Sequence, residues 1–250
     1  MFYEAAKAIV APLVHAIYRP TMTGQENIPS RGGVLLASNH ASSVADTVFL
    51  PIMVRRKVRF LGKSDYFTGR GLRGRVVRYF MKGVGTLPVD RTGGRHSDAA
   101  IRSGLTVLGA GGALAIYPEG TRSPDGRLYR GKTGVARLAL EARVPVIPVA
   151  MIGTFDAQPP GRLLPRRSPR VKVVIGEPLV FAQFYGTAHD RTVLRAVTDH
   201  IMMTIQELSG QEYVPEYASV AKRRLQAEAK KSAEAESGIA DSDADAGSAS

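Results

Sequence analysis

Short apolar runs that alternate with helical patterns constrain the fold of this chain more than any other feature. Residues 34–38, 113–117 and 144–152 are largely apolar and end at polar or turn residues, as buried strands do. Residues 98–108 and 134–141 lie between these runs and carry patterns typical of helices. Strands that alternate with helices are typical of an α/β domain. The sequence therefore predicts an α/β fold with a central mixed sheet flanked by helices.

Other stretches extend this pattern. Helices are predicted at residues 43–54 and 193–208, and strands at residues 84–89 and 171–175. Residues 24–33 have the composition of a loop. The pattern shows no internal repeat, so the main domain is expected to be one unit.

The first twenty residues predict a separate amphipathic helix. Apolar residues recur there at steps of three and four: Phe2, Tyr3, Ala6, Ile9, Val10, Leu13, Val14, Ile17 and Tyr18. The helix is expected to end at Arg19-Pro20. Such a helix either packs on the core or lies in a membrane interface, and the sequence leaves both open. Neither a signal peptide nor a membrane-spanning helix is expected, because the segment lacks a basic start and no apolar run reaches about 18 residues.

Three regions follow from these patterns. Residues 1–20 form the amphipathic helix, a possible membrane-surface anchor, and residues 21–220 form the α/β domain. Residues 221–250 are rich in Ala, Glu, Lys, Ser and Asp, which predicts a tail that begins helical and ends disordered.

The charge balance predicts an anionic partner. The chain has 34 basic against 22 acidic side chains, a formal charge of +12. Five of those acids and no base lie beyond Ser232, so the preceding chain carries 34 basic against 17 acidic residues. Nucleic acid, acidic lipid head groups and phosphorylated substrates all remain open on charge alone.

Cysteine is absent from the chain. Disulfides, thiolate metal sites and a cysteine nucleophile are therefore excluded. The spacing of the remaining candidate ligands suggests no metal site either.

The first candidate site lies between the strand at residues 34–38 and the helix that follows. His40 stands directly after the strand, and Asp46 stands six residues later. A histidine can take a proton from a hydroxyl, and a nearby carboxylate fixes its tautomer and stabilises its charged form. The other interpretation is that both residues cap the start of the helix.

The second candidate site is the turn Tyr117-Pro118-Glu119-Gly120-Thr121-Arg122-Ser123, with Lys132 nearby in sequence. Backbone N–H groups, the Thr121 hydroxyl and the Arg122 guanidinium suit a phosphate, since Arg engages it through two donors. A plain turn is the other interpretation. Arg91, just beyond the strand at residues 84–89, is either a further phosphate ligand or a solvated charge.

These blocks, together with Val144-Pro145-Val146-Ile147-Pro148-Val149, resemble the lysophosphatidic acid acyltransferase family. That family is marked by His-x-x-x-x-Asp, an Arg-containing block, Glu-Gly-Thr-Arg and Val-Pro-x-x-Pro-Val. The resemblance covers residues 21–180 and continues more weakly to residue 220. One position departs from it, because five residues rather than four separate His40 from Asp46. An extra residue in a regular helix would rotate Asp46 by about 100°, so it must be absorbed before the helix begins.

The resemblance implies a role for each matching residue. His40 would be the general base and Asp46 would orient it. Phosphate binding would fall to Arg91, Gly120, Thr121 and Arg122. Lys132 would shape the site, and Glu119 would shape it or contact the acceptor.

The resemblance also implies the reaction. A fatty acyl chain would move from acyl-CoA or acyl carrier protein thioester to the free hydroxyl of 1-acylglycerol 3-phosphate (lysophosphatidic acid), giving phosphatidate in phospholipid synthesis. No bound cofactor or metal is expected. The enzyme would lie peripherally on an anionic membrane surface, the cytoplasmic face of the plasma membrane, and no nucleic acid would be bound.

A basic stretch at residues 55–82 fits that setting. Its cations are Arg55, Arg56, Lys57, Arg59, Lys63, Arg70, Arg73, Arg75, Arg78 and Lys82. Juxtamembrane cations contribute about 1 kcal/mol each on an anionic lipid surface. They could equally meet the phosphates of CoA or an acidic carrier protein, or form a merely solvated face.

Three alternatives remain. Another lysophospholipid or a glycolipid hydroxyl could be the acceptor. A serine hydrolase built on Ser38, Ser42 or Ser43 would lack the Gly-x-Ser-x-Gly elbow. A basic lipid- or nucleic-acid-binding protein without catalysis would leave the Glu119–Arg122 turn unexplained and has no recognisable binding module.

Overall fold

A seven-stranded sheet forms the centre of the computed structural model, which describes residues 2–42, 45–63, 71–83, 85–89, 96–159 and 170–229, with 69, 162, 166 and 232. The strand order is β1-β8-β7-β2-β5-β3-β4. The strands are β1 (Thr21–Thr23), β2 (Val34–Ser38), β3 (Val58–Lys63), β4 (Thr86–Val89), β5 (Ala113–Ile116), β7 (Val146–Ile152) and β8 (Lys172–Ile175). Only the β7–β8 pair is antiparallel; the other pairs are parallel. The predicted mixed sheet is confirmed.

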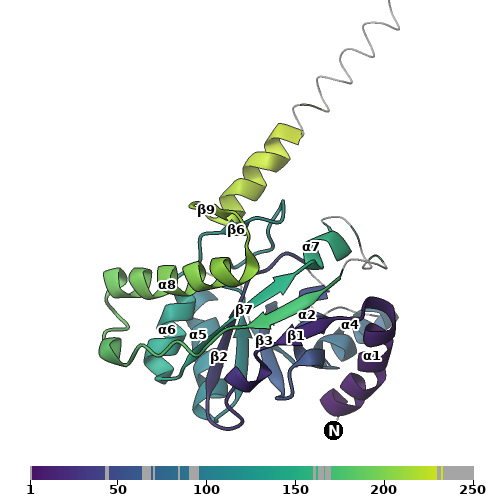
Figure 1. Cartoon of the computed structure of the whole chain (residues 1–250), viewed down its shortest axis with the longest axis horizontal. Helices are drawn as coiled ribbons and strands as arrows, with labels where there is room; N and C mark the ends of the chain where they lie inside the picture. The colour runs from purple at the N-terminus through teal and green to yellow at the C-terminus, as the bar shows by residue number, and fades with distance from the viewer. Residues whose placement is uncertain are drawn as a thin grey trace, which may run out of the picture.

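Helices cover both faces of this sheet (Figure 1). They are α1 (Phe2–Tyr18), α2 (Ala45–Met53), α4 (Gly71–Gly83), α5 (His96–Gly109), α6 (Gly134–Ala142), α7 (Thr154–Ala157) and α8 (Arg191–Ser209). Leu35 of β2 packs with α5, α6 and α8 in one apolar cluster. Leu36 points to the other face and packs with α1, α2 and α7. Every residue of β2 is buried, as a central parallel strand requires.

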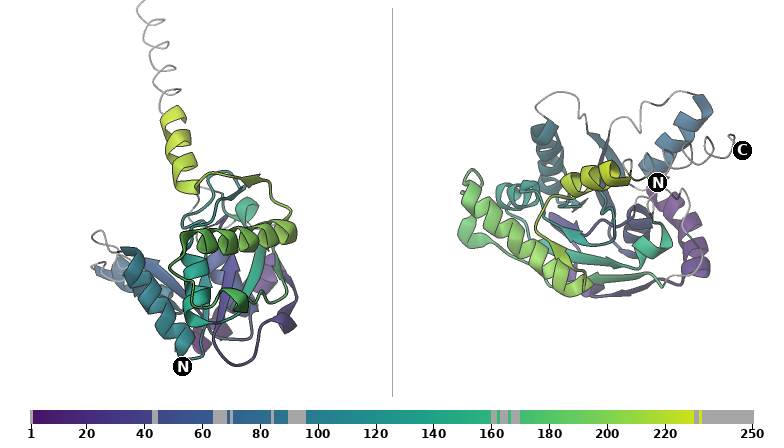
Figure 2. Two further views of the ribbon diagram at one scale, coloured as in Figure 1. Left: turned by 90° about the vertical axis from the view of Figure 1, so that its left-hand side faces the viewer. Right: turned by 90° about the horizontal axis from the view of Figure 1, so that it is seen from above.

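Helices α8 and α1 lie on opposite sides of the molecule (Figure 2). Tyr3 and Val14 of α1 are buried against the core, whereas Ile9 is 76% and Leu13 is 61% exposed. The predicted helix therefore has one packed face and one exposed apolar face. Among the described residues, no helix combines the length and apolar composition needed to cross a bilayer.

Two elements that the sequence did not predict overlap the basic stretch at residues 55–82. In β3, Val58 and Phe60 are buried while Arg59 is exposed, so the alternation is that of a strand with charges on its outer face. Helix α4 follows. Arg56 does not join a solvated face: its guanidinium donates to the carbonyls of Pro29, Gly32 and Gly111 at 2.7 to 2.9 Å.

Residues 211–221 fold back over the domain. Strand β9 (Tyr213–Val214) pairs with β6 (Leu128–Tyr129), and residues 218–229 form a helix that projects from the body (Figures 1 and 2). The predicted boundary at residue 220 falls inside this helix. Residues 233–250 of the predicted tail lie outside the described part of the chain.

Candidate active site

Asn39 fixes the exit of the chain from β2. Its side-chain amide donates to the carbonyl of Met151 at 3.0 Å and accepts from the Met151 N–H at 2.7 Å. The side chain thereby extends the pairing between β2 and β7 by one residue. His40 follows at the carboxyl end of the strand, where open α/β sheets place their ligands.

His40 and Asp46 are in contact despite the extra residue between them. The ring Nδ1 lies 3.0 Å from Asp46 Oδ2, and the Asp46 side chain is completely buried. The same oxygen accepts the Ser42 N–H at 2.8 Å, and Ser42 Oγ accepts the Ala45 N–H at 3.2 Å. The longer connection is therefore accommodated before α2 begins at Ala45. With Nδ1 donating to the carboxylate, a neutral ring keeps its lone pair on Nε2.

Tyr117 supports the His40 ring from one side. The two rings are stacked with centroids 3.9 Å apart and planes 11° apart. Burial raises the pKa of the Tyr117 hydroxyl well above its usual value, so it stays neutral. The His40 side chain is 15% exposed, which leaves one edge open to a substrate.

Glu119 ties the histidine to the turn at residues 117–123. Oε1 accepts the His40 backbone N–H at 2.9 Å, and Oε2 accepts the Tyr129 N–H at 3.1 Å. Burial raises the pKa of Glu119 to about 8, although the two backbone donors act in the opposite direction. A backbone hydrogen bond also joins these segments, because the Ser123 N–H donates to the His40 carbonyl at 2.8 Å.

The turn presents cations next to this pair. Gly120 has a φ of +73°, and a Cβ there would lie 3.0 Å from Lys132 Nζ, so the lysine lies against the turn. Arg122 and Lys132 are both exposed. Neither has a hydrogen bond or ion pair from its side chain within the described part of the chain. Two uncompensated cations beside a general-base candidate are suited to a phosphate-bearing acceptor.

A partly buried polar cluster that the sequence did not predict follows the turn. Asp125 Oδ2 accepts from Arg127 Nη2 at 2.7 Å and from the Tyr129 hydroxyl at 2.8 Å. Tyr129 is fully buried against Ala218 and Ala221. The only local signal for this cluster is weak: an Asp-x-Arg-x-Tyr alternation at residues 125–129, typical of a short strand.

Gln211 connects the two halves of the site. Its Oε1 accepts from Asn39 Nδ2 at 2.7 Å, and its Nε2 donates to the Gly126 carbonyl at 2.5 Å. Gln211 lies in a polar stretch after α8 that carries no motif, so the sequence alone does not indicate its role.

The other predicted residues fall as follows. Thr121 is half-buried in the turn. Arg91 and Ser43 lie outside the described residues. The Ser38 hydroxyl donates to the Asn39 carbonyl, and the Ser42 hydroxyl donates to Gln158 Oε1. Neither serine hydroxyl therefore donates to His40. Among the described residues, no cluster of His, Asp or Glu side chains could hold a metal ion.

Comparison with known proteins identifies the family. A family model described as Acyltransferase matches residues 19–152, more than half of the chain. The chain belongs to the acyltransferase family. The matched region contains His40, Asp46, Glu119 and Arg122, whereas Gln211 lies beyond it.

Relatives of this acyltransferase-family chain carry related names. A chloroplastic 1-acyl-sn-glycerol-3-phosphate acyltransferase of Brassica napus is 27% identical over 74% of this chain and 51% of the relative. A 1-acyl-sn-glycerol-3-phosphate acyltransferase of Borreliella burgdorferi is 29% identical over 53% of this chain and 51% of its own. The chain thus spans about half the length of these curated relatives.

A solved structure shares the fold. The 1-acyl-sn-glycerophosphate acyltransferase PlsC from Thermotoga maritima matches with a TM-score of 0.57 and 24% identity, over 82% of each chain. The arrangement of sheet and helices is therefore one that an acyltransferase adopts.

Proposed function

We propose that this protein transfers a fatty acyl chain from an acyl thioester to the free hydroxyl of 1-acylglycerol 3-phosphate, giving phosphatidate. The observation that carries the proposal is the His40–Asp46 pair, 3.0 Å apart, beside a turn that exposes Arg122 and Lys132. A base next to cations that have no side-chain partner among the described residues is suited to a hydroxyl on a phosphorylated molecule. The names of the Brassica and Borreliella relatives support the same acceptor.

The proposed reaction begins at Nε2 of His40, which accepts the proton of the acceptor hydroxyl. The hydroxyl oxygen forms a bond to the thioester carbonyl carbon, and the carbon–sulfur bond then breaks. The protonated imidazole returns its proton to the leaving thiolate, so the products are an ester and a free thiol. Asp46 holds Nδ1 and stabilises the ring while it is charged. A thioester is already activated, so no covalent enzyme intermediate or bound cofactor is part of the proposal.

The acceptor phosphate is assigned to the turn. Arg122, Thr121 and the backbone around Gly120 would bind it, with Lys132 at the side and Arg91 as a further ligand. Glu119 has a different part in this proposal, because both of its oxygens already accept backbone N–H groups. It holds His40 and the turn in register rather than contacting the acceptor.

The lipid acceptor also suggests where the protein acts. Ile9 and Leu13 of α1 and Leu72 of α4, each more than 60% exposed, lie on helices that pack against each other. Arg75 and Arg78 of α4 add positive charge beside them. These features support peripheral binding to an anionic membrane surface, the cytoplasmic face of the plasma membrane in this proposal.

An acceptor screen tests the function. Purified full-length protein would be incubated with one acyl-CoA and a set of lysolipids, glycolipids and glycerol phosphates, with lipid products identified by mass spectrometry. Phosphatidate from 1-acylglycerol 3-phosphate is expected as the main product. Preferred acylation of a lysolipid without a terminal phosphate, or of a glycolipid, would contradict the assigned acceptor.

A further inference from the structure

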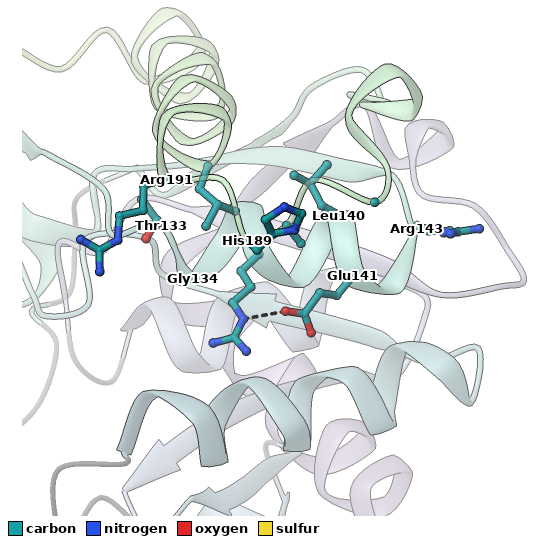
Figure 3. Close-up of a pocket in the computed structure, with 11 residues that line it drawn as sticks. Thr133, Gly134, Leu140, Glu141, Arg143, His189 and Arg191 are labelled. Carbon is teal, nitrogen blue, oxygen red and sulfur yellow. Dashed lines mark hydrogen bonds and ion pairs between the residues drawn. The ribbon is translucent and has the colours of Figure 1, made fainter.

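A concavity lies away from His40, between α6 and the segment that leads into α8 (Figure 3). Its volume is about 660 Å³, within the range of small-molecule sites. Thr133, Arg137, Arg143, His189, Arg191 and Leu194 are among its lining residues. The described residues assigned to catalysis and to the acceptor phosphate do not line it. The proposed reaction therefore leaves this groove unused.

Two of its cations are uncompensated. Arg137 is neutralised, because it bonds to Glu141 at 2.6 Å and to Asp98 at 2.8 Å. The side chains of Arg143 and Arg191 are exposed, and neither has an ion pair or hydrogen bond with any part of the chain that the structure describes. Arginines in a concave site without carboxylate partners attract phosphate groups.

The backbone conformation of Arg143 also supports a role for its side chain. Its φ is +53°, a left-handed conformation at the end of α6 that glycine usually occupies. A residue with a Cβ costs about 1 kcal/mol or more in this conformation. An arginine held there against the usual preference suggests that its side chain has a use.

The groove begins at the active-site edge of the sheet. Thr133 lines one end of it and follows Lys132, whose side chain lies against Gly120. Arg191 lies beside Thr133 in Figure 3, and Arg143 lies at the opposite end. Helix α6 connects these ends, and its nine residues span about 14 Å. A ligand in the groove would thus extend from the site toward a remote cation.

We propose that this groove binds the phosphorylated nucleotide of a coenzyme A thioester, which would be the acyl donor. The proposal rests on the proposed acyl transfer. Arg143 and Arg191, at the two ends of the groove, would each meet a phosphate. A carrier protein fits less well, because the surface is concave.

Binding of free CoA tests the groove directly. Titration calorimetry would compare the wild-type chain with an Arg143→Gln/Arg191→Gln double variant. Arg31→Gln is the matched control, since Arg31 is an exposed cation in a loop outside the groove. The double variant should bind CoA at least about tenfold more weakly, as expected for lost charge-assisted contacts. The control should bind normally. An unchanged Kd in the double variant would overturn the assignment.

Kinetics separate this proposal from the proposed function. The double variant should raise the KM for acyl-CoA, while the KM for 1-acylglycerol 3-phosphate and the rate with an acyl-pantetheine donor stay unchanged. The double variant could bind CoA more weakly while the wild type forms no phosphatidate. That outcome would support CoA binding in the groove and reject the proposed function. If the double variant transfers acyl groups normally with an unchanged KM for acyl-CoA, the groove does not bind CoA, and the proposed function stands. A double variant that is slower only with acyl carrier protein thioester as donor would lead to the same conclusion.

Discussion

The side chains of Asn39 and Gln211 are joined by a 2.7 Å hydrogen bond across 172 positions of sequence. Asn39 directly precedes His40, and Gln211 also donates to the Gly126 carbonyl in the segment that follows the phosphate turn. One side chain from outside the family motifs therefore connects the proposed base to the proposed phosphate site.

Loss of that connection should affect turnover. Gln211→Ala is expected to lower kcat about tenfold, because small displacements of a reacting group are costly even when the fold survives. The KM for the acyl donor should change little. Steady-state kinetics with both substrates would be compared with Gln183→Ala, an exposed glutamine in a short 3₁₀ helix before α8. A lower Tm with unchanged kcat would show that Gln211 is only structural.

Removal of the proposed base should stop catalysis. His40→Ala is expected to lower kcat by about 10²- to 10⁴-fold, as for the loss of a general base, with the fold intact. Asp46→Asn should also lower kcat, since the amide can leave His40 in the wrong tautomer. Circular dichroism and single-turnover assays would check both variants. Turnover near the wild-type level in His40→Ala would rule out the mechanism.

The exposed cations of the turn should act on the acceptor. Arg122→Ala is expected to raise the KM for a phosphorylated acceptor about tenfold or more, through the loss of one charge-assisted contact. The KM for the acyl donor should remain within about twofold of the wild type on the same argument. Equal effects on both substrates would contradict the phosphate assignment.

The raised pKa of Glu119 predicts how stability depends on pH. The unfolded carboxyl releases its proton near pH 4.5 and the folded one near pH 8, so the folded state binds more protons between these values. The free energy of unfolding should therefore fall as pH rises through this window, by about 1 kcal/mol per unit, and level off above it. Urea unfolding of the wild type and Glu119→Gln from pH 5 to 9 measures the difference. A difference that does not vary with pH would contradict the assignment.

The exposed face of α1 should contribute to membrane binding. Ile9→Ser and Leu13→Ser remove about 1.5 to 3 kcal/mol of apolar burial each if these side chains enter the interface. Sedimentation with anionic vesicles should fall accordingly. Val180→Ser is the control, because Val180 is 58% exposed but lies far along the chain. Deleting the whole helix is a poorer test, since it also removes buried Tyr3 and Val14. Undiminished sedimentation of the double variant would exclude this face as the anchor.

The sequence was most informative where a pattern is local. The buried strand at residues 34–38 was predicted with its exact bounds because its apolar residues are contiguous. Strand β3 was missed because its outward-facing charges merge with those of its neighbours. The His40–Asp46 contact needed the structure, since spacing alone could not tell whether the residues before α2 absorb one more position.

The support of the turn could not be predicted for a different reason. Tyr129, Ala218 and Gln211 are ordinary residue types, and their contacts depend on how residues 210–221 fold back over the domain. No local pattern encodes a meeting of segments that lie more than 80 positions apart. The structure alone brings them together.

The pairing of β6 with β9 has a consequence for synthesis of the protein. A ribosome that has translated residue 152 has already made every described residue assigned to catalysis and to the acceptor phosphate, and the whole segment that matches the family model. It has not yet made Gln211 or the strand that pairs with Leu128–Tyr129. We therefore expect the nascent chain to remain inactive until about sixty further residues have emerged, so that the enzyme becomes competent late in its own translation.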